Sequence, residues 1–176
     1  VMAIRWVPDM GWEHGLYVSF FHAVSAFNNA GFSLFSNNLM NYRDDPIISL
    51  TIAGLLVLGG IGFTVVVDLV RNRRWRKLKL HSKLMLVMTP ALLLLGTLMF
   101  WLLERNNPGT LGATSFGGQW LAAFFHSASA RTAGFNTIDI GLMTPAALLF
   151  LMMLMFIGAG TTSTGGGIKV TTFAVV

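Results

Sequence analysis

Residues 20–32 read FFHAVSAFNNAGF, and residues 124–135 read FFHSASARTAGF. The two stretches align at their Phe-Phe-His ends and at their Ala-Gly-Phe ends, with one residue gained or lost between them. Each stretch is aromatic and moderately apolar but too short to cross a bilayer, and each is followed by polar residues and a longer apolar run. A unit that occurs twice in one chain predicts a repeated structure, here a helix, a short loop and a second helix.

The composition indicates that most of the chain lies in a lipid bilayer. Of its 176 residues, 54% are hydrophobic and 11% are charged, and the mean hydropathy is +0.66. A soluble domain carries roughly 25% charged residues, which this chain lacks. The absence of cysteine excludes a disulfide scaffold, a thiolate metal site and a cysteine nucleophile. We therefore expect an all-α membrane protein.

Apolar runs at residues 47–70 and 84–103 predict two transmembrane helices, and residues 141–176 predict a broken third one. The stretch between the first two runs, residues 71–83, holds seven of the twelve basic residues. By the positive-inside rule it predicts a cytoplasmic loop, and we expect no nucleic-acid partner. The first run then crosses inward, the second crosses outward, and the third heads inward again.

The two repeated segments, residues 12–35 and 118–139, have both ends on the outer side in this topology. Such a segment is re-entrant, which is tolerated only around a water-filled cavity or inside protein. A short helix that stops partway directs the negative end of its dipole toward the membrane centre, which favours a cation there. Gly31 and Gly134 permit unusual backbone dihedral angles as the chain returns, and returning carbonyl oxygens can replace the water shell of an ion. About four such loops are needed to surround an ion, so we expect this chain to be part of a longer polypeptide.

Three motifs carry a resemblance to a known family: NNAGF at residues 28–32, ARTAGFNTID at 130–139 and GTTSTGGGIK at 160–169. They resemble the pore loops and the interrupted helix of the Trk/Ktr/HKT superfamily of potassium transporters. The resemblance implies helix–re-entrant pore loop–helix repeats arranged around a central pore. It places residues 1–70 in the second repeat and residues 84–176 in the third, with the first and fourth repeats missing.

The resemblance also implies which residues carry the function. Potassium would be bound by backbone carbonyl oxygens only, in two filter segments (residues 28–31 and 131–134) made of Asn28, Asn29, Ala30, Gly31, Arg131, Thr132, Ala133 and Gly134. Below the filter, a gate loop (residues 158–169) would act through Gly158, Gly160, Thr161, Thr162, Ser163, Thr164, Gly165, Gly166, Gly167 and Lys169.

For the whole protein, the resemblance implies potassium uptake through this filter in the plasma (inner) membrane, with several membrane crossings. It implies a homodimer that works with a cytosolic nucleotide-binding ring. No covalently bound cofactor and no enzymatic activity are expected, and Na⁺ is a candidate activator beside the transported K⁺.

Two other functions are compatible with parts of the sequence. A secondary transporter with discontinuous helices around a midplane substrate site would also show repeats and glycine interruptions, although its breaks would lie inside full spans. A membrane-embedded hydrolase could use His22 or His126, but no serine or aspartate stands at a convincing spacing.

Several side chains also have alternative interpretations. The gate loop could be a bent, closely packed helix or a phosphate cradle, but Gly166 stands where a P-loop requires lysine. His22 and His126 could bind a metal, yet hydrogen bonding within each repeat is the simpler interpretation. We expect Arg131 to turn away from the ion and pair with backbone carbonyls or a carboxylate, with Asp139 as a candidate. Asp68, an intramembrane carboxylate, is expected to pair with the arginines that follow it, Arg71 and Arg73.

Overall fold

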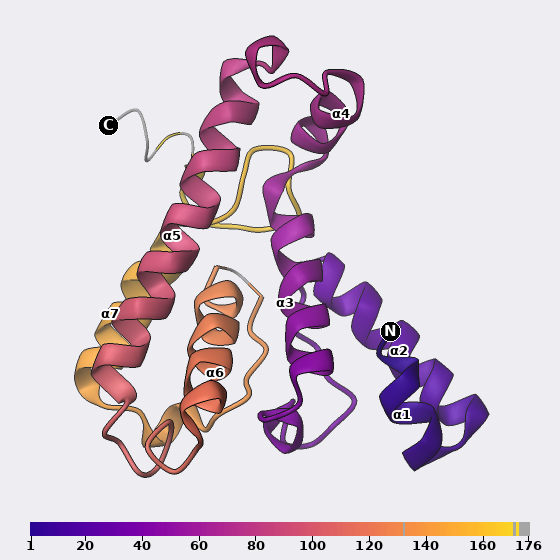
Figure 1. Ribbon diagram of the computed structural model, residues 1–176, viewed down its shortest axis with the longest axis vertical. Coiled ribbons are helices and arrows are strands. Elements are labelled where there is room, and N and C mark those ends of the chain that lie inside the picture. The colour runs from indigo at the N-terminus through magenta and orange to yellow at the C-terminus, as the bar shows by residue number, and fades with distance from the viewer. Residues whose placement is uncertain (132, 171, 173–176) are drawn as a thin grey trace.

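The computed structural model describes residues 1–131, 133–170 and 172, and every regular element in these residues is helical (Figure 1). The all-α fold is therefore confirmed. In chain order the elements are α1 (Ala3–Met10), α2 (Trp12–Phe27), the 3₁₀ turn η1 (Met40–Tyr42), α3 (Pro46–Ile61), α4 (Phe63–Arg71), η2 (Trp75–Lys77), α5 (Leu80–Glu104), α6 (Phe116–Ser129), η3 (Ile140–Leu142) and α7 (Pro145–Phe156).

Local sequence signals fix the first residues of three helices. The carboxylate of Asp45 accepts a hydrogen bond from the N–H of Ile47, and Pro46 occupies the first helical position of α3, where a missing N–H costs nothing. The hydroxyls of Ser115 and Thr144 cap α6 and α7 in the same way. All three helices begin at the same end of the molecule (Figure 1).

The two short helices α2 and α6 enter the molecule from this end and stop partway along its length (Figure 1). After each of them the chain turns back, and the next α-helix, α3 or α7, begins at the end where α2 or α6 began. Each repeat thus has the helix–loop–helix order that the sequence predicts.

Residues 47–70 were predicted as one helix, and this prediction is wrong. They form α3 and α4, which are bent by 88° relative to each other. The break falls at Gly62, whose φ of 97° is a conformation that side-chain-bearing residues rarely adopt. A Cβ atom at Gly62 would lie 2.6 Å from the carbonyl oxygen of Thr161, and the N–H of Phe63 donates to the carbonyl of Thr162. The gate loop therefore packs directly against the break between α3 and α4.

Among the described residues, α5 alone is a single helix long and apolar enough to cross a membrane, and α3 with α4 qualifies if the bent pair is one span. The helix predicted at 84–103 is α5, which begins four residues earlier, at Leu80. Within residues 141–176, predicted as a broken third span, α7 ends at Phe156 and the gate loop follows. Part of the chain beyond it, residues 171 and 173–176, lies outside the described residues.

Packing of α3 against α6 joins the two repeats. One buried cluster combines α1, α2 and α3 with side chains of residues 84–176, among them Phe125 and Phe135. A second cluster lies within residues 84–176 and joins Phe100 of α5 with Ala123 of α6 and Ala147 of α7. The two predicted filter segments are therefore carried on one continuous helical framework.

Candidate functional site

The first filter segment begins where α2 ends. The N–H of Asn28 still donates to the carbonyl of Val24, and the chain then leaves the helix through Asn29 and Gly31, whose φ angles are 51° and 70°. The hydroxyl of Ser25 donates a hydrogen bond of 2.8 Å to the carbonyl of Phe32. This bond ties the returning backbone to the last turn of α2.

The second filter segment repeats this arrangement after α6. The N–H groups of Ala133 and Gly134 both donate to the carbonyl of Ser129, and Gly134 has a φ of 85°. The hydroxyl of Ser129 donates to the carbonyl of Phe135 at 2.6 Å. Thr132, the remaining residue predicted for this segment apart from Arg131, lies outside the described residues.

Sequence analysis did not single out this pair of serines. Ser25 and Ser129 stand at equivalent positions of the two aligned stretches, five residues after the first phenylalanine. Each hydroxyl donates to the carbonyl of the phenylalanine that follows the filter glycine. The presence of serine at the same position of both repeats was therefore a sequence signal that a hydroxyl group holds each loop.

The matched histidines are held by hydrogen bonds inside their own repeats, as expected. The ring of His22 bonds to the hydroxyl of Ser33 at 3.0 Å, and the ring of His126 accepts from the N–H of Thr137 at 3.4 Å. Both side chains are buried. In the part of the chain that the structure describes, no group of three metal-binding side chains forms. Each histidine thus connects its helix, α2 or α6, to the chain segment that returns from it.

The two filter segments meet through their backbones. A Cβ atom placed on Gly31 would lie 1.9 Å from the carbonyl oxygen of Ala133. Further from the pore helices, the N–H of Leu39 donates to the carbonyl of Asn136, and the N–H of Asn136 donates to the side chain of Asn38. The repeats are therefore joined at the two predicted filter segments as well as through α3 and α6.

The gate loop closes on itself at its base. The N–H of Gly158 donates to the carbonyl of Ile168 at 3.0 Å, and the ammonium of Lys169 donates to the carbonyl of Gly165 at 2.8 Å. A Cβ atom at Gly158 would lie 1.8 Å from the carbonyl oxygen of Gly166, so only glycine permits the strands of the base to approach this closely. The loop crosses the space between α5 and α3 (Figure 1).

Hydrogen bonds anchor the gate loop to three neighbours. The N–H of Gly160 donates to Gly60 at the end of α3, and Thr161 bonds to the ring of His81 in α5 at 3.0 Å. The third contact reaches the filter: the side-chain amide of Asn29 donates to the hydroxyl of Thr164 at 2.9 Å. The predicted gate and the first filter segment are therefore in direct contact.

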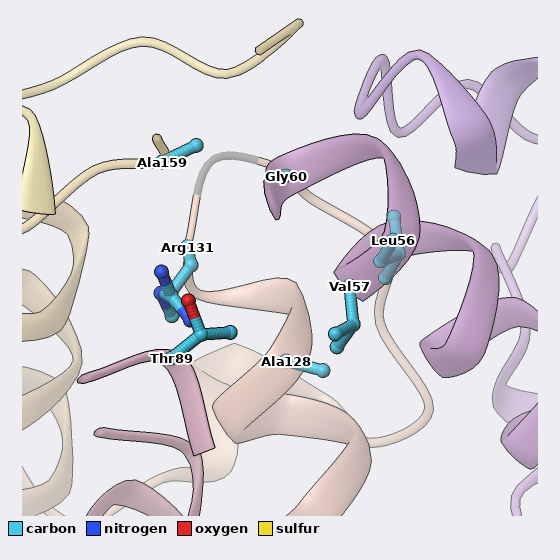
Figure 2. A pocket seen from close by; sticks show the side chains of 7 residues that line it. All are labelled: Leu56, Val57, Gly60, Thr89, Ala128, Arg131 and Ala159. Carbon is cyan, nitrogen blue, oxygen red and sulfur yellow. The ribbon is translucent and has the colours of Figure 1, made fainter. Parts of the chain in front are cut away.

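Arg131 lies in the second filter segment and its side chain is buried. The expected ion pair with Asp139 is absent among the described residues, because the carboxylate of Asp139 accepts from the N–H of Gly141 and caps η3 instead. Figure 2 shows the guanidinium group directed toward Thr89 of α5, in a small cavity beside α3 and α6.

Asp68 does not pair with Arg71 or Arg73 in the structure, so that expectation is also wrong. Its carboxylate accepts hydrogen bonds from the hydroxyl of Ser82 at 2.5 Å, the N–H of Lys79 at 3.0 Å and the side chain of Asn72. It joins the end of α4 to the start of α5. The carboxylate of Asp68 has a structural role, because all three donors belong to the turn between α4 and α5 and to the first residues of α5.

Comparison with known proteins identifies the family to which this chain belongs. The family described as "TrkH: Cation transport protein" matches residues 7–176. The chain belongs to the TrkH family. This confirms the resemblance that the two loop motifs and the glycine-rich motif carry, and it places the chain among membrane cation transport proteins.

Relatives within the TrkH family share much of the sequence. The chain is 59% identical to the Ktr system potassium uptake protein B of Vibrio alginolyticus, over 99% of this chain and 39% of that protein. It is 38% identical to the potassium/sodium uptake protein NtpJ of Enterococcus hirae, over 99% and 39%. The crystal structure of the potassium transporter TrkH from Vibrio parahaemolyticus has a similar fold, with a TM-score of 0.72 at 21% identity, covering 99% of this chain and 43% of that one.

This TrkH-family chain spans about 40% of the length of the curated relatives named above. Two repeats would supply two of the roughly four loops that are needed to surround an ion.

Proposed function

We propose that the full-length protein takes up potassium through a selectivity filter of backbone carbonyl oxygens, to which this chain contributes two of the segments. One observation carries the proposal above all. Two pore helices stop partway along the molecule, and each is followed by a returning strand with a positive-φ glycine. The two strands meet at Gly31 and Ala133.

The physical argument concerns what an ion would meet at this place. The C-terminal ends of α2 and α6 carry partial negative charge from the aligned peptide dipoles of each helix. Main-chain oxygens of the returning strands add further dipoles and need no ionised side chain. Bracing by Ser25, Ser129 and the two histidines fixes each strand. A fixed set of oxygens can select an ion, whereas a mobile set would adapt to any cation.

The gate loop would control passage below the filter. Its glycines and hydroxyl side chains support this role, since they permit a compact loop and offer exchangeable hydrogen bonds. Contacts with Asn29 and His81 hold it in the arrangement described here. Breaking a few such bonds would require little free energy, on the order of 1 kcal/mol each.

The proposal extends to the setting of the protein. We place it in the plasma membrane as a multi-pass homodimer with residues 71–83 on the cytoplasmic side, facing a nucleotide-binding ring subunit. The uneven distribution of basic residues supports this orientation. Na⁺ is proposed as an activator, and a relative named a potassium/sodium uptake protein supports testing it.

One observation favours the alternative of a secondary transporter. A bend of 88° separates α3 from α4, and α7 ends at Phe156 before the gate loop, as expected of discontinuous helices around a midplane site. The return of α2 and α6 segments to their end of entry favours the pore instead. Cysteine accessibility at Phe21 and Phe32 separates the two: labelling of both from the outer side supports a pore, and labelling from opposite sides supports a transporter.

The decisive experiment measures ⁸⁶Rb⁺ and ²²Na⁺ flux in proteoliposomes of the full-length protein with Gly31→Ser and Gly134→Ser. We expect both variants to lose preference for potassium over sodium. Gly54→Ser in α3 is the matched control, because that glycine has open space around it and no positive φ. Retention of the wild-type preference in both filter variants would refute the assignment.

A further inference from the structure

A small cavity lies behind the second filter segment, between the two repeats (Figure 2). Four structural elements and the filter segment enclose it: α3, α5, α6 and the start of the gate loop. Its lining residues are Leu56, Val57, Gly60, Thr89, Ala128, Arg131 and Ala159. Apart from Arg131 and Thr89, these side chains are apolar or absent.

Two residues that line this cavity each have a buried polar atom with no hydrogen-bond partner among the described residues: Nε of Arg131 and Oγ1 of Thr89. Both residues are buried, with 8% and 3% of their surfaces exposed. Buried donors in native proteins are almost always paired with protein or with ordered water. Two unpaired atoms that share one cavity therefore indicate a missing common partner.

The size of the cavity defines that partner. About 10 Å³ is open to the centre of a water molecule, which is roughly the lower limit for one bound water. A water molecule can accept from the N–H of Arg131 and exchange a second hydrogen bond with the hydroxyl of Thr89, which can donate or accept. We propose that one ordered water molecule links Arg131 to Thr89 and fixes the second filter segment against α5.

The electrostatic surroundings favour a neutral ligand over an anion. Arg131 lies two residues beyond the last residue of α6, where the partial negative charge of a helix C-terminus stabilises a cation. This partial charge already stabilises the guanidinium, so the cavity does not require an anion to neutralise Arg131. Water supplies the missing hydrogen bonds without adding charge.

The water-mediated link makes Arg131 and Thr89 positioning residues for the filter. This role rests on the proposed function. Arg131 is the first residue of its filter segment, so holding its side chain restrains the carbonyls beside it. The cavity wall also includes Ala159. The water site therefore stands where the filter, α5 and the gate loop adjoin.

The test uses the full-length protein with Thr89→Val, which keeps the side-chain shape and removes the hydroxyl. We expect potassium over sodium preference to fall about fivefold, the effect of one lost buried hydrogen bond. Thr89→Ser should retain the wild-type preference. Thr97→Val is the matched control, because Thr97 is buried in the same helix and bonds only to its own turn.

A high-resolution cryo-EM map gives the second readout. We expect a density peak within hydrogen-bonding distance of Nε of Arg131 and Oγ1 of Thr89 in the wild type, and none in Thr89→Val. Absence of the peak in the wild type, or equal preferences in Thr89→Val and Thr97→Val, would overturn the inference. If Gly31→Ser and Gly134→Ser still lose selectivity in that case, the water site alone has failed and the proposed function stands.

Discussion

The two pore loops share a framework and differ in what their filter segments contact. In both, a serine hydroxyl in the last turn of the pore helix and a histidine one turn earlier hold the returning strand. Asn29 of the first loop then bonds to Thr164 of the gate loop, whereas Arg131 of the second is directed into a small cavity beside α5. The shared contacts therefore build each loop, and the differing contacts give the loops separate tasks.

The largest effect is expected at the filter glycines, and it should be unequal. An alanine at Gly31 would combine a left-handed backbone with a Cβ 1.9 Å from a carbonyl oxygen, whereas Gly134 has the left-handed backbone but open space. Strain and overpacking together predict a loss of potassium selectivity on the order of a hundredfold for Gly31→Ala. Strain alone predicts about tenfold for Gly134→Ala. Flux ratios in proteoliposomes measure both.

Equal losses of potassium selectivity in Gly31→Ala and Gly134→Ala would contradict this difference between the two loops, since only Gly31 faces the backbone of the other loop. Gly54→Ala in α3 serves as the control and should improve helix stability slightly without changing selectivity. Normal membrane insertion of all three variants excludes a folding defect as the cause.

A smaller effect is expected from separating the first loop from the gate. Asn29→Ala removes the hydrogen bond to Thr164, and we expect basal uptake to rise about fivefold because the gate loop loses one restraint. Thr164→Val should do the same, and the double variant should add little. Additive effects would show that the two side chains act independently. Asn37→Ala is the control, since its amide bonds to Asn41 outside both loops.

The smallest effect is expected from removing the serine hydroxyl that both loops share. Ser25→Ala and Ser129→Ala each remove a buried hydroxyl bonded to a returning carbonyl. We expect each to lower the free energy of unfolding by about 1 kcal/mol, seen as similar decreases in thermal unfolding temperature of the purified protein. Ser36→Ala, at an exposed site, should have no effect. A clear inequality between the two serines would show that the braces are not equivalent.

Much of the helical order could be predicted from sequence because it depends on local patterns. The apolar run that forms α5, the capping residues before α3 and α7, and the repeated motif after α2 and α6 are all visible in the printed residues. The hydrogen bonding of His22 and His126 within their own repeats was also predicted correctly, because equivalent positions in a repeat make equivalent contacts.

The remaining features depend on contacts between distant segments. The break at Gly62 could not be foreseen, because an apolar stretch with glycines also suits a straight membrane helix, and the bend depends on residues 161 and 162. Asp68 has arginines nearby in sequence, yet its partners come from the start of α5. Arg131 lacks a carboxylate because Asp139 caps a local turn.

The central claim is that the two filter segments form part of an ion-binding site, and anomalous scattering from Rb⁺ or Tl⁺ in crystals of the full-length protein tests it most directly. The account predicts a peak on the pore axis beside residues 28–31 and 131–134. A peak only between the interrupted helices, near Gly62 and the end of α7, with none beside the filter segments, would contradict the account and favour a midplane transport site.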